Sequence, residues 1–176
     1  PEGEGSSTVI LHREGNAPND GIAVAETVPL GIDMGESTRV EVNGFFSNLG
    51  DIDVYRAELR GGDVLQLNLF GAGLTVSVFD ESGRELITSS SDANAAAQAV
   101  DTGEVSLPEG GNASLGRVLS RDGVYYVQVA GADPELLGGA YTLQMRVDRP
   151  ALESQPVGTH QILCLDFSGA VVPADI

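Results

Sequence analysis

The sequence predicts an all-β protein, folded as an antiparallel, jelly-roll-like β-sandwich of about eight strands. Three observations lead to this prediction. Apolar and polar residues alternate with a period of two in a series of short segments, which is typical of strands with one buried face. The 23 glycines suit many tight turns between short strands. No long helical segment competes with this pattern.

The clearest strands lie within residues 50–70, GDIDVYRAELRGGDVLQLNLF. Apolar residues occupy alternate positions in two segments that meet at Gly61 and Gly62. Alternation that is interrupted by a glycine pair is typical of a β-hairpin. We therefore expect the two segments to pair with each other and to bury one face. The residues expected on that face are Tyr55, Ala57, Leu59, Leu65, Leu67 and Leu69.

Further strands are expected on both sides of this pair. They are residues 38–46, 74–80, 84–88, 115–120, 123–130 and 140–147. The segment 123–130, GVYYVQVA, has the strongest alternation, and Glu81-Ser82-Gly83 predicts a turn between 74–80 and 84–88. Residues 89–111 include an alanine-rich stretch without an apolar stripe, and we expect a long surface insertion there.

The pattern divides the chain into three regions. Residues 1–17 are expected to be a flexible lead or an edge strand, because the polar start is followed by TVILH at 8–12. Residues 18–148 hold the sandwich. Residues 149–176 begin with a proline-containing linker and continue with a strand-like segment, HQILCLDFSGA, which we expect to be the truncated start of a following unit.

The chain is strongly acidic, with a formal net charge of −17 and nine basic residues. The negative field repels phosphate, which makes nucleic acid and anionic lipid surfaces poor partners and favours cations. No apolar run is long enough to insert through a membrane. The single cysteine, Cys164, excludes an intramolecular disulfide and is expected to be a buried apolar residue. Composition does not indicate an oligomeric state.

Residues 18–147 resemble the bacterial pre-peptidase C-terminal domain family in a series of motifs that stand in the order found in that family. The motifs are PND at 18–20, VNG at 42–44, DIDVY at 51–55, RGGDVL at 60–65, LTVSVFDESG at 74–83, GVYYVQV at 123–129 and GAYTL at 139–143. The motif DIDVY at 51–55 matches the D-x-D-x-aromatic signature of the family. The resemblance covers about three quarters of the chain.

The resemblance implies a non-catalytic accessory domain of a secreted bacterial hydrolase, in particular a protease. Such a domain would aid secretion, anchoring or substrate binding, with an extracellular polymer or the catalytic domain of the parent enzyme as its partner. The tail at 161–169, QILCLDFSG, is similar to a strand that opens some secreted metalloprotease domains, so the parent is expected to be a secreted metalloprotease. The alternative is a calcium-dependent adhesion module or a carbohydrate- or collagen-binding module.

Four residues are candidate metal ligands: Asn19, Asp20, Asp51 and Asp53. Calcium takes six to eight oxygen ligands, often gathered from loops. The resemblance implies that acids of the opening loop and of the D-x-D motif converge on calcium, with Glu14 as the nearby acid before the opening loop. The residues by themselves also allow a structural interpretation. In that case Asp51 caps a turn, and Asp53 pairs with an arginine or with backbone N–H groups.

Other site chemistries find no support in the sequence. His12, His160 and Cys164 lack the spacing of zinc ligands. No G-x-S-x-G motif marks a nucleophile, and we expect no catalytic residues and no organic cofactor. Tyr126, on the face of its strand opposite Tyr125, is the aromatic residue expected to be available for binding.

Overall fold

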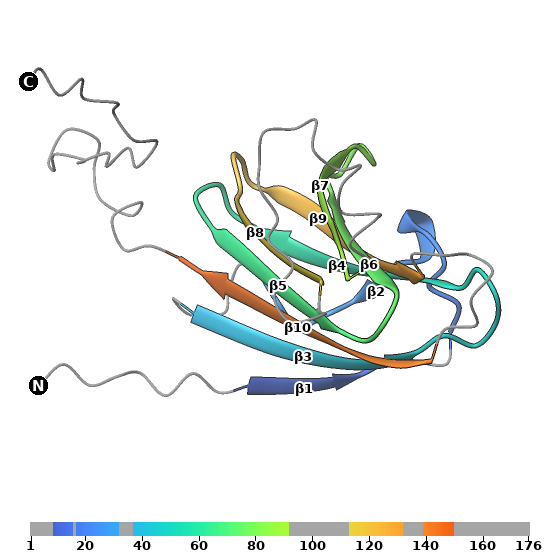
Figure 1. Cartoon of the computed structure of the whole chain (residues 1–176). Helices are drawn as coiled ribbons and strands as arrows, with labels where there is room; N and C mark the ends of the chain where they lie inside the picture. Colours follow the sequence, from blue (N-terminus) through green and yellow to red (C-terminus); the bar gives the residue numbers. More distant parts are fainter. Residues whose placement is uncertain (1–8, 16, 32–36, 92–112, 132–138, 150–176) are drawn as a thin grey trace, which may run out of the picture.

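The computed structural model describes residues 9–15, 17–31, 37–91, 113–131 and 139–149, which form two packed β-sheets (Figure 1). Sheet A has the strand order β1 (Val9–Arg13), β3 (Ser37–Phe45), β10 (Ala140–Asp148), β5 (Val64–Phe70) and β8 (Ala113–Val118). Sheet B has the order β2 (Glu26–Thr27), β4 (Ile52–Leu59), β9 (Gly123–Gly131), β6 (Leu74–Phe79) and β7 (Glu85–Ser90). The predicted all-β sandwich is therefore confirmed.

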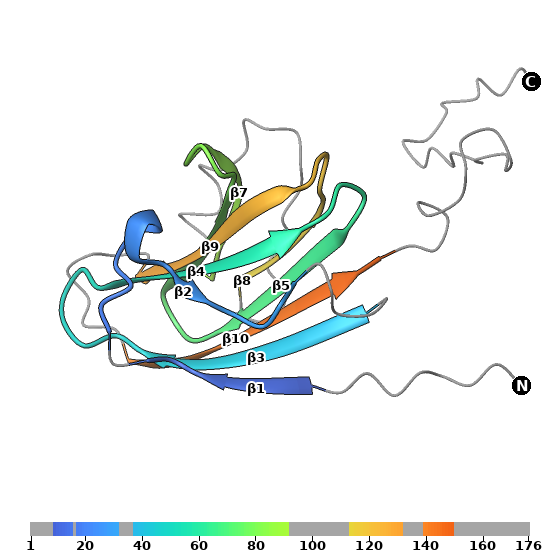
Figure 2. The same ribbon diagram turned by 180° about the vertical axis from the view of Figure 1, so that it is seen from behind.

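The strand count is ten in the described residues, against the eight expected, because two short strands near the N-terminus complete the sheet edges. β1 pairs with β3 and β2 pairs with β4, and both pairs are parallel, whereas the remaining pairs are antiparallel. Seen from behind, β2 runs beside β4, and the short 3-10 helix η1 (Ile22–Val24) lies against β4 (Figure 2). The chain thus enters at the edge of sheet A and crosses to the edge of sheet B.

The core lies between the sheets and consists mainly of leucine and valine. The six residues expected on the buried face of the central strands are all enclosed, as are inward-facing residues of β3, β9 and β10. The largest enclosed side chains include Tyr55, Phe46, Leu59, Leu65, Leu67, Leu69, Leu143 and Met145. A β-strand shows alternate residues to opposite faces, so the period of two in the sequence locates this core correctly.

The expected hairpin within residues 50–70 is wrong. β4 belongs to sheet B, where it pairs with β2 and β9, and β5 belongs to sheet A, where it pairs with β8 and β10. The Gly61-Gly62 turn, in which Gly62 has a φ of +89°, carries the chain from one sheet to the other. Alternation specifies which face of a strand is buried, and it does not specify the neighbour with which the strand pairs.

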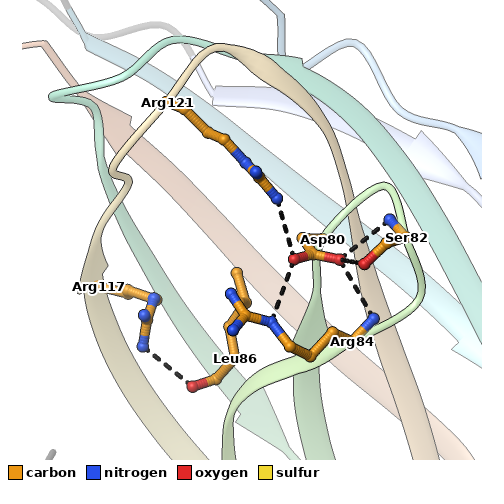
Figure 3. A network of polar contacts seen from close by, with 6 residues as sticks. All are labelled: Asp80, Ser82, Arg84, Leu86, Arg117 and Arg121. Atoms are coloured by element: carbon orange, nitrogen blue, oxygen red, sulfur yellow. Dashed lines mark hydrogen bonds and ion pairs between the residues drawn. The ribbon is translucent and has the colours of Figure 1, made fainter.

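The expected hairpin of residues 74–88 is confirmed, since β6 and β7 pair directly. Gly83 adopts a φ of +79° in the turn. The Asp80 carboxylate accepts hydrogen bonds from the backbone N–H and hydroxyl of Ser82 and from Arg84, and Arg121 reaches it from the β8–β9 connection at 3.1 Å (Figure 3). These bonds satisfy a carboxylate that is almost fully enclosed.

Several expectations lie outside the described residues. They are residues 92–111 of the insertion expected at 89–111, the strand-like segment after residue 149 with His160 and Cys164, and the lead before residue 9. The start expected for the insertion is wrong, because Ser89 and Ser90 are the last residues of β7. Among the described residues, no helix is long and apolar enough to cross a membrane.

Candidate functional site

A pocket of about 780 Å³ opens at the end of the sandwich where the β1–β2 and β3–β4 connections and the start of β10 meet. All four predicted ligands, Asn19, Asp20, Asp51 and Asp53, line this pocket, and so does Glu14. The structure therefore brings together two regions that are about 30 residues apart in the sequence. We call this region the pocket end.

The opening loop is fixed to the start of β4 by its backbone. The N–H of Val54 donates to the carbonyl oxygen of Asn19 at 2.9 Å. Asp53 precedes Val54 and faces inward, opposite Val129 of β9. Because this bond holds the loop beside the strand, Asn19 and Asp53 line the same pocket wall.

Asp53 begins a chain of buried hydrogen bonds that crosses the sandwich. The hydroxyl of Tyr141 donates to Asp53 Oδ2 at 2.6 Å, and the hydroxyls of Tyr141 and Tyr55 lie 2.5 Å apart. Since the Tyr141 proton points to Asp53, Tyr55 is the donor to Tyr141. The Tyr141 ring lies over Gly44, where a Cβ would overlap it, so glycine at this position makes room for the chain.

Burial is the main cause that raises the pKa of Asp53 from its usual 3.8 to about 7. The hydrogen bond from Tyr141 lowers the pKa, but the negative charges of Glu14 and Asp51 and a hydrogen bond with Glu14 raise it. Burial likewise raises the pKa of Tyr141 and Tyr55. Asp53 thus titrates near neutral pH and can gain or lose a proton when a ligand binds.

Asp51 caps the turn between β3 and β4, as the structural interpretation predicts. One oxygen accepts from the backbone N–H of Ser47 at 2.5 Å and from its hydroxyl at 2.8 Å, and the other accepts from the N–H of Ile52 at 3.1 Å. The same interpretation gave Asp53 an arginine or a backbone N–H as its partner. The partner is instead the Tyr141 hydroxyl.

The remaining residues of the pocket carry oxygen atoms with different degrees of exposure. Asp20 is exposed, and Glu14 accepts a hydrogen bond from the N–H of Phe45 at 2.7 Å. Asn19 is buried, and its Nδ2 atom has no hydrogen-bond partner among the described residues. An unpartnered buried donor requires a physical explanation. The donor set is entirely oxygen and amide, which suits calcium and not zinc.

The pocket does not present a complete metal cage. Within the described ranges, no three His, Cys, Asp or Glu side chains are placed so that they could hold a metal ion. Any ion held here would need the Asn19 amide, backbone carbonyls or water in addition to the carboxylates.

Sequence reasoning missed Tyr55, Tyr141 and Gly44 as residues of this region. All three stand in motifs that were recognised, DIDVY, GAYTL and VNG. Their spacing along the chain does not reveal that they meet, because Tyr55 and Tyr141 are 86 residues apart. Tyr126, which was expected to be available for binding, is half-buried on the outer face of sheet B, in register with Arg56 and Phe79.

Comparisons with known proteins establish no family for this chain. No family model matches it, and no curated protein matches it. Among solved structures, the pre-peptidase C-terminal domain of collagenase from Bacillus anthracis has a TM-score of 0.45 and 15% identity, and the match covers 76% of this chain and 100% of that one.

Two further structures are periplasmic inhibitors of g-type lysozyme, named PliG. The Salmonella Typhimurium protein has a TM-score of 0.42 and 13% identity, with 70% of this chain and 100% of that chain covered. The Aeromonas hydrophila protein has the same TM-score and identity, with 70% and 97% covered. Similarity at this level carries no argument about function.

Proposed function

We propose that this chain is a non-catalytic accessory domain of a secreted bacterial hydrolase, and that calcium bound in the end pocket ties its loops together. The observation that carries the proposal is the convergence of Asn19, Asp20, Asp51 and Asp53 on one pocket. Within the described residues, no arginine forms an ion pair with these acids. Arg13 also lines the pocket, but it forms no ion pair with them, and carboxylates without an ion pair around one space favour a cation.

The residues that would hold the ion are Asp20 and Asp53, with Asn19, Asp51 and Glu14 around them. The side-chain amide of Asn19 can be turned, because oxygen and nitrogen are assigned from hydrogen bonds. Turning it would replace the unpartnered Nδ2 donor by an oxygen ligand. Calcium would supply a structural link between the opening loop and β4. Because a cage of three acids is not already formed, binding would draw the loops together.

The accessory role is supported by the ordered motifs in the sequence and by the way three of them meet. Asp53 and Tyr55 come from DIDVY, Tyr141 comes from GAYTL, and Gly44 of VNG makes room for the tyrosine ring. In this role the domain anchors or positions the hydrolase. An extracellular site can be weak, because calcium outside cells is in the range that fills modules with dissociation constants of 10⁻⁴–10⁻³ M.

A thermal and urea unfolding comparison of metal-stripped protein with and without millimolar Ca²⁺ tests the proposal. Calcium at 100 times its dissociation constant should add about 2.7 kcal/mol to the free energy of unfolding. Asp20→Asn should remove most of this gain and change the stability of the metal-free protein little, because Asp20 is exposed. Glu85→Gln, an exposed carboxylate on β7, is the matched control and should keep the full gain.

Two results would contradict the calcium site: no gain in the unchanged protein, or an equal gain in Asp20→Asn. The non-catalytic part is tested separately with generic peptide, ester and glycoside substrates, none of which should be hydrolysed. Turnover that disappears when one acid is replaced would instead make the chain an enzyme.

A further inference from the structure

A second, separate site lies on the outer face of sheet A. On this face the strand register aligns Arg39 of β3 with Arg146 of β10 and Gln66 of β5, and the next row aligns Glu41, Gln144 and Asn68. These six side chains line a shallow pocket of about 240 Å³, which shares no residue with the pocket end.

Arg39 and Arg146 are directly opposite each other in an antiparallel pair. Like charges in this position repel, and a carboxylate close to both would relieve the repulsion. Asp148 compensates Arg146, with a hydrogen bond of 2.9 Å from Nε to Oδ1. Arg39 has no such partner within the described residues, and its Nε atom is enclosed and unsatisfied.

A shortage of acidic residues does not explain why Arg39 forms no ion pair within the described residues. The chain has 26 acidic residues for nine arginines, and the buried Asp63 and Asp80 are each bonded to arginine. Arg39 shares its pocket with Glu41, but no ion pair joins the two among the described residues. Local rules are broken in this way at sites that serve a ligand.

The side chains around the arginine pair are three amides and the carboxylate of Glu41, and Gln66 donates through Nε2 to Asp148 at 3.5 Å. Gln144 donates through Nε2 to Glu41 at 3.1 Å, and Asn68 accepts through Oδ1 from Ser114 at 2.7 Å. Both residues are exposed, and among the described residues no hydrogen bond occupies the Gln144 carbonyl oxygen, an acceptor, or the Asn68 amide NH₂, a donor. Alternating donors and acceptors that line this shallow pocket suit the hydroxyl groups of a sugar.

We propose that this shallow pocket, called the groove below, binds an oligosaccharide through one uronic acid unit, whose carboxylate lies between Arg39 and Arg146. Guanidinium binds the planar carboxylate in a two-bond geometry, and the amides of Gln66, Gln144 and Asn68 bind the neighbouring hydroxyls. The net charge of −17 disfavours a densely charged polyanion. It therefore selects a ligand with an isolated carboxylate among neutral sugars. This inference goes beyond the proposed calcium site, and neither depends on the other.

Calorimetric titration of metal-stripped protein at low salt tests the groove with two matched probes. They are xylotetraose that carries a single glucuronic acid branch, and plain xylotetraose. The charged probe should bind, and its affinity should fall with added salt; the neutral probe should bind about tenfold more weakly or not at all. Removing metal beforehand keeps calcium from bridging the carboxylate to the pocket end.

Variants locate the site. Arg39→Met should weaken binding of the charged probe by about tenfold or more, and Arg39→Lys should also weaken it, because lysine keeps the charge but loses the planar fork. Arg60→Gln removes one positive charge at the exposed β4–β5 turn and should leave binding unchanged. Arg39→Met should not lower the melting temperature, since it relieves the repulsion with Arg146 and removes an unsatisfied donor.

Four results would overturn the proposal. They are equal binding of the neutral probe, full binding by Arg39→Met, a marked fall in the melting temperature of that variant, and displacement of the probe by acetate at equal concentration. The third would show that Arg39 supports the fold, and the fourth would reduce the site to simple carboxylate binding. None of them bears on the effect of calcium at the pocket end.

Discussion

The two ends of the sandwich both concentrate aspartates, and they treat them in opposite ways. At the end formed by the β4–β5, β6–β7 and β8–β9 connections, which we call the turn end, Asp63 pairs with Arg149 and Asp80 pairs with Arg84 and Arg121. At the pocket end, no ion pair joins an arginine to Asp51 or Asp53 in the described parts of the chain. One end is neutralised from within the protein, whereas the other is not.

Burial alone does not separate the two ends, because Asp53 and Asp80 are 1% and 3% exposed. Hydrogen bonds from Ser82, followed by those from the Arg84 backbone and its charge, lower the pKa of Asp80 to about 2. Burial next to other acids raises that of Asp53 to about 7. At the turn end, the charges of Asp63 and Asp80 are therefore balanced within the protein, and these residues have a structural role. The pocket end keeps an unfavourable charge that a bound cation would relieve.

The largest effect is expected at the turn end, from Asp63→Ala. Asp63 is fully enclosed, accepts from Arg149 at 2.7 and 2.9 Å, and also accepts from the N–H of Arg60 at 2.9 Å. Removing one partner of a buried ion pair costs about 3–5 kcal/mol. We expect a loss of this size in the free energy of unfolding, measured in urea.

Asp122→Ala is the matched control for that measurement. Asp122 is exposed at the same turn end and accepts one hydrogen bond, from the N–H of Gly61 at 2.8 Å. Its loss should cost about 1 kcal/mol. Equal losses in the two variants would contradict the distinction between an enclosed, paired aspartate and an exposed one.

At the pocket end, Asp53→Asn should raise the free energy of unfolding, whereas Asp63→Ala at the turn end lowers it. The folded pKa of about 7 lies above the usual 3.8, so the folded protein holds a proton that the unfolded chain releases between these values. The contribution of Asp53 to the free energy of unfolding is therefore fully present below about pH 4 and is lost as pH rises to about 7. Asparagine keeps an acceptor for Tyr141 and has no proton to lose, so the variant should be the more stable protein at pH 7.5.

Urea unfolding of metal-stripped protein at several pH values measures this difference, with Glu85→Gln as the control. A variant less stable than the unchanged protein at pH 7.5 would show that the Asp53 carboxylate contributes to the metal-free fold. The comparison between the two ends would then fail.

The sequence predicts the core residues and the aspartates of the pocket end, but it does not predict the difference between the two ends. Alternation located the core, including Tyr55 and Leu65, because the faces of a strand follow from local geometry. It misjudged the pairing of β4 and β5, since a glycine turn can join strands of one sheet or of two. The sequence also indicated Asp51 and Asp53, but the Tyr141 hydroxyl that bonds to Asp53 comes from 88 residues away. The groups that lower the pKa of Asp80, Ser82 and Arg84, are its near neighbours in the chain, and Arg121 joins them from 41 residues away.

Of the three enclosed aspartates, Asp80 should show the smallest effect on replacement by Asn, because the arginines that reach it, unlike Arg149, are largely exposed and screened by water. The folded pKa of about 2 lies below the usual 3.8, so ionised Asp80 stabilises the fold above about pH 4. That contribution is lost as pH falls from about 4 to about 2. The unchanged protein should therefore exceed the variant in stability at neutral pH, and the difference should shrink toward pH 2. For Asp53→Asn the difference has the reverse sign and vanishes below about pH 4, so the same urea titration separates the two ends. A difference for Asp80→Asn that grows on acidification would mean that the turn end does not hold its carboxylate in the charged state.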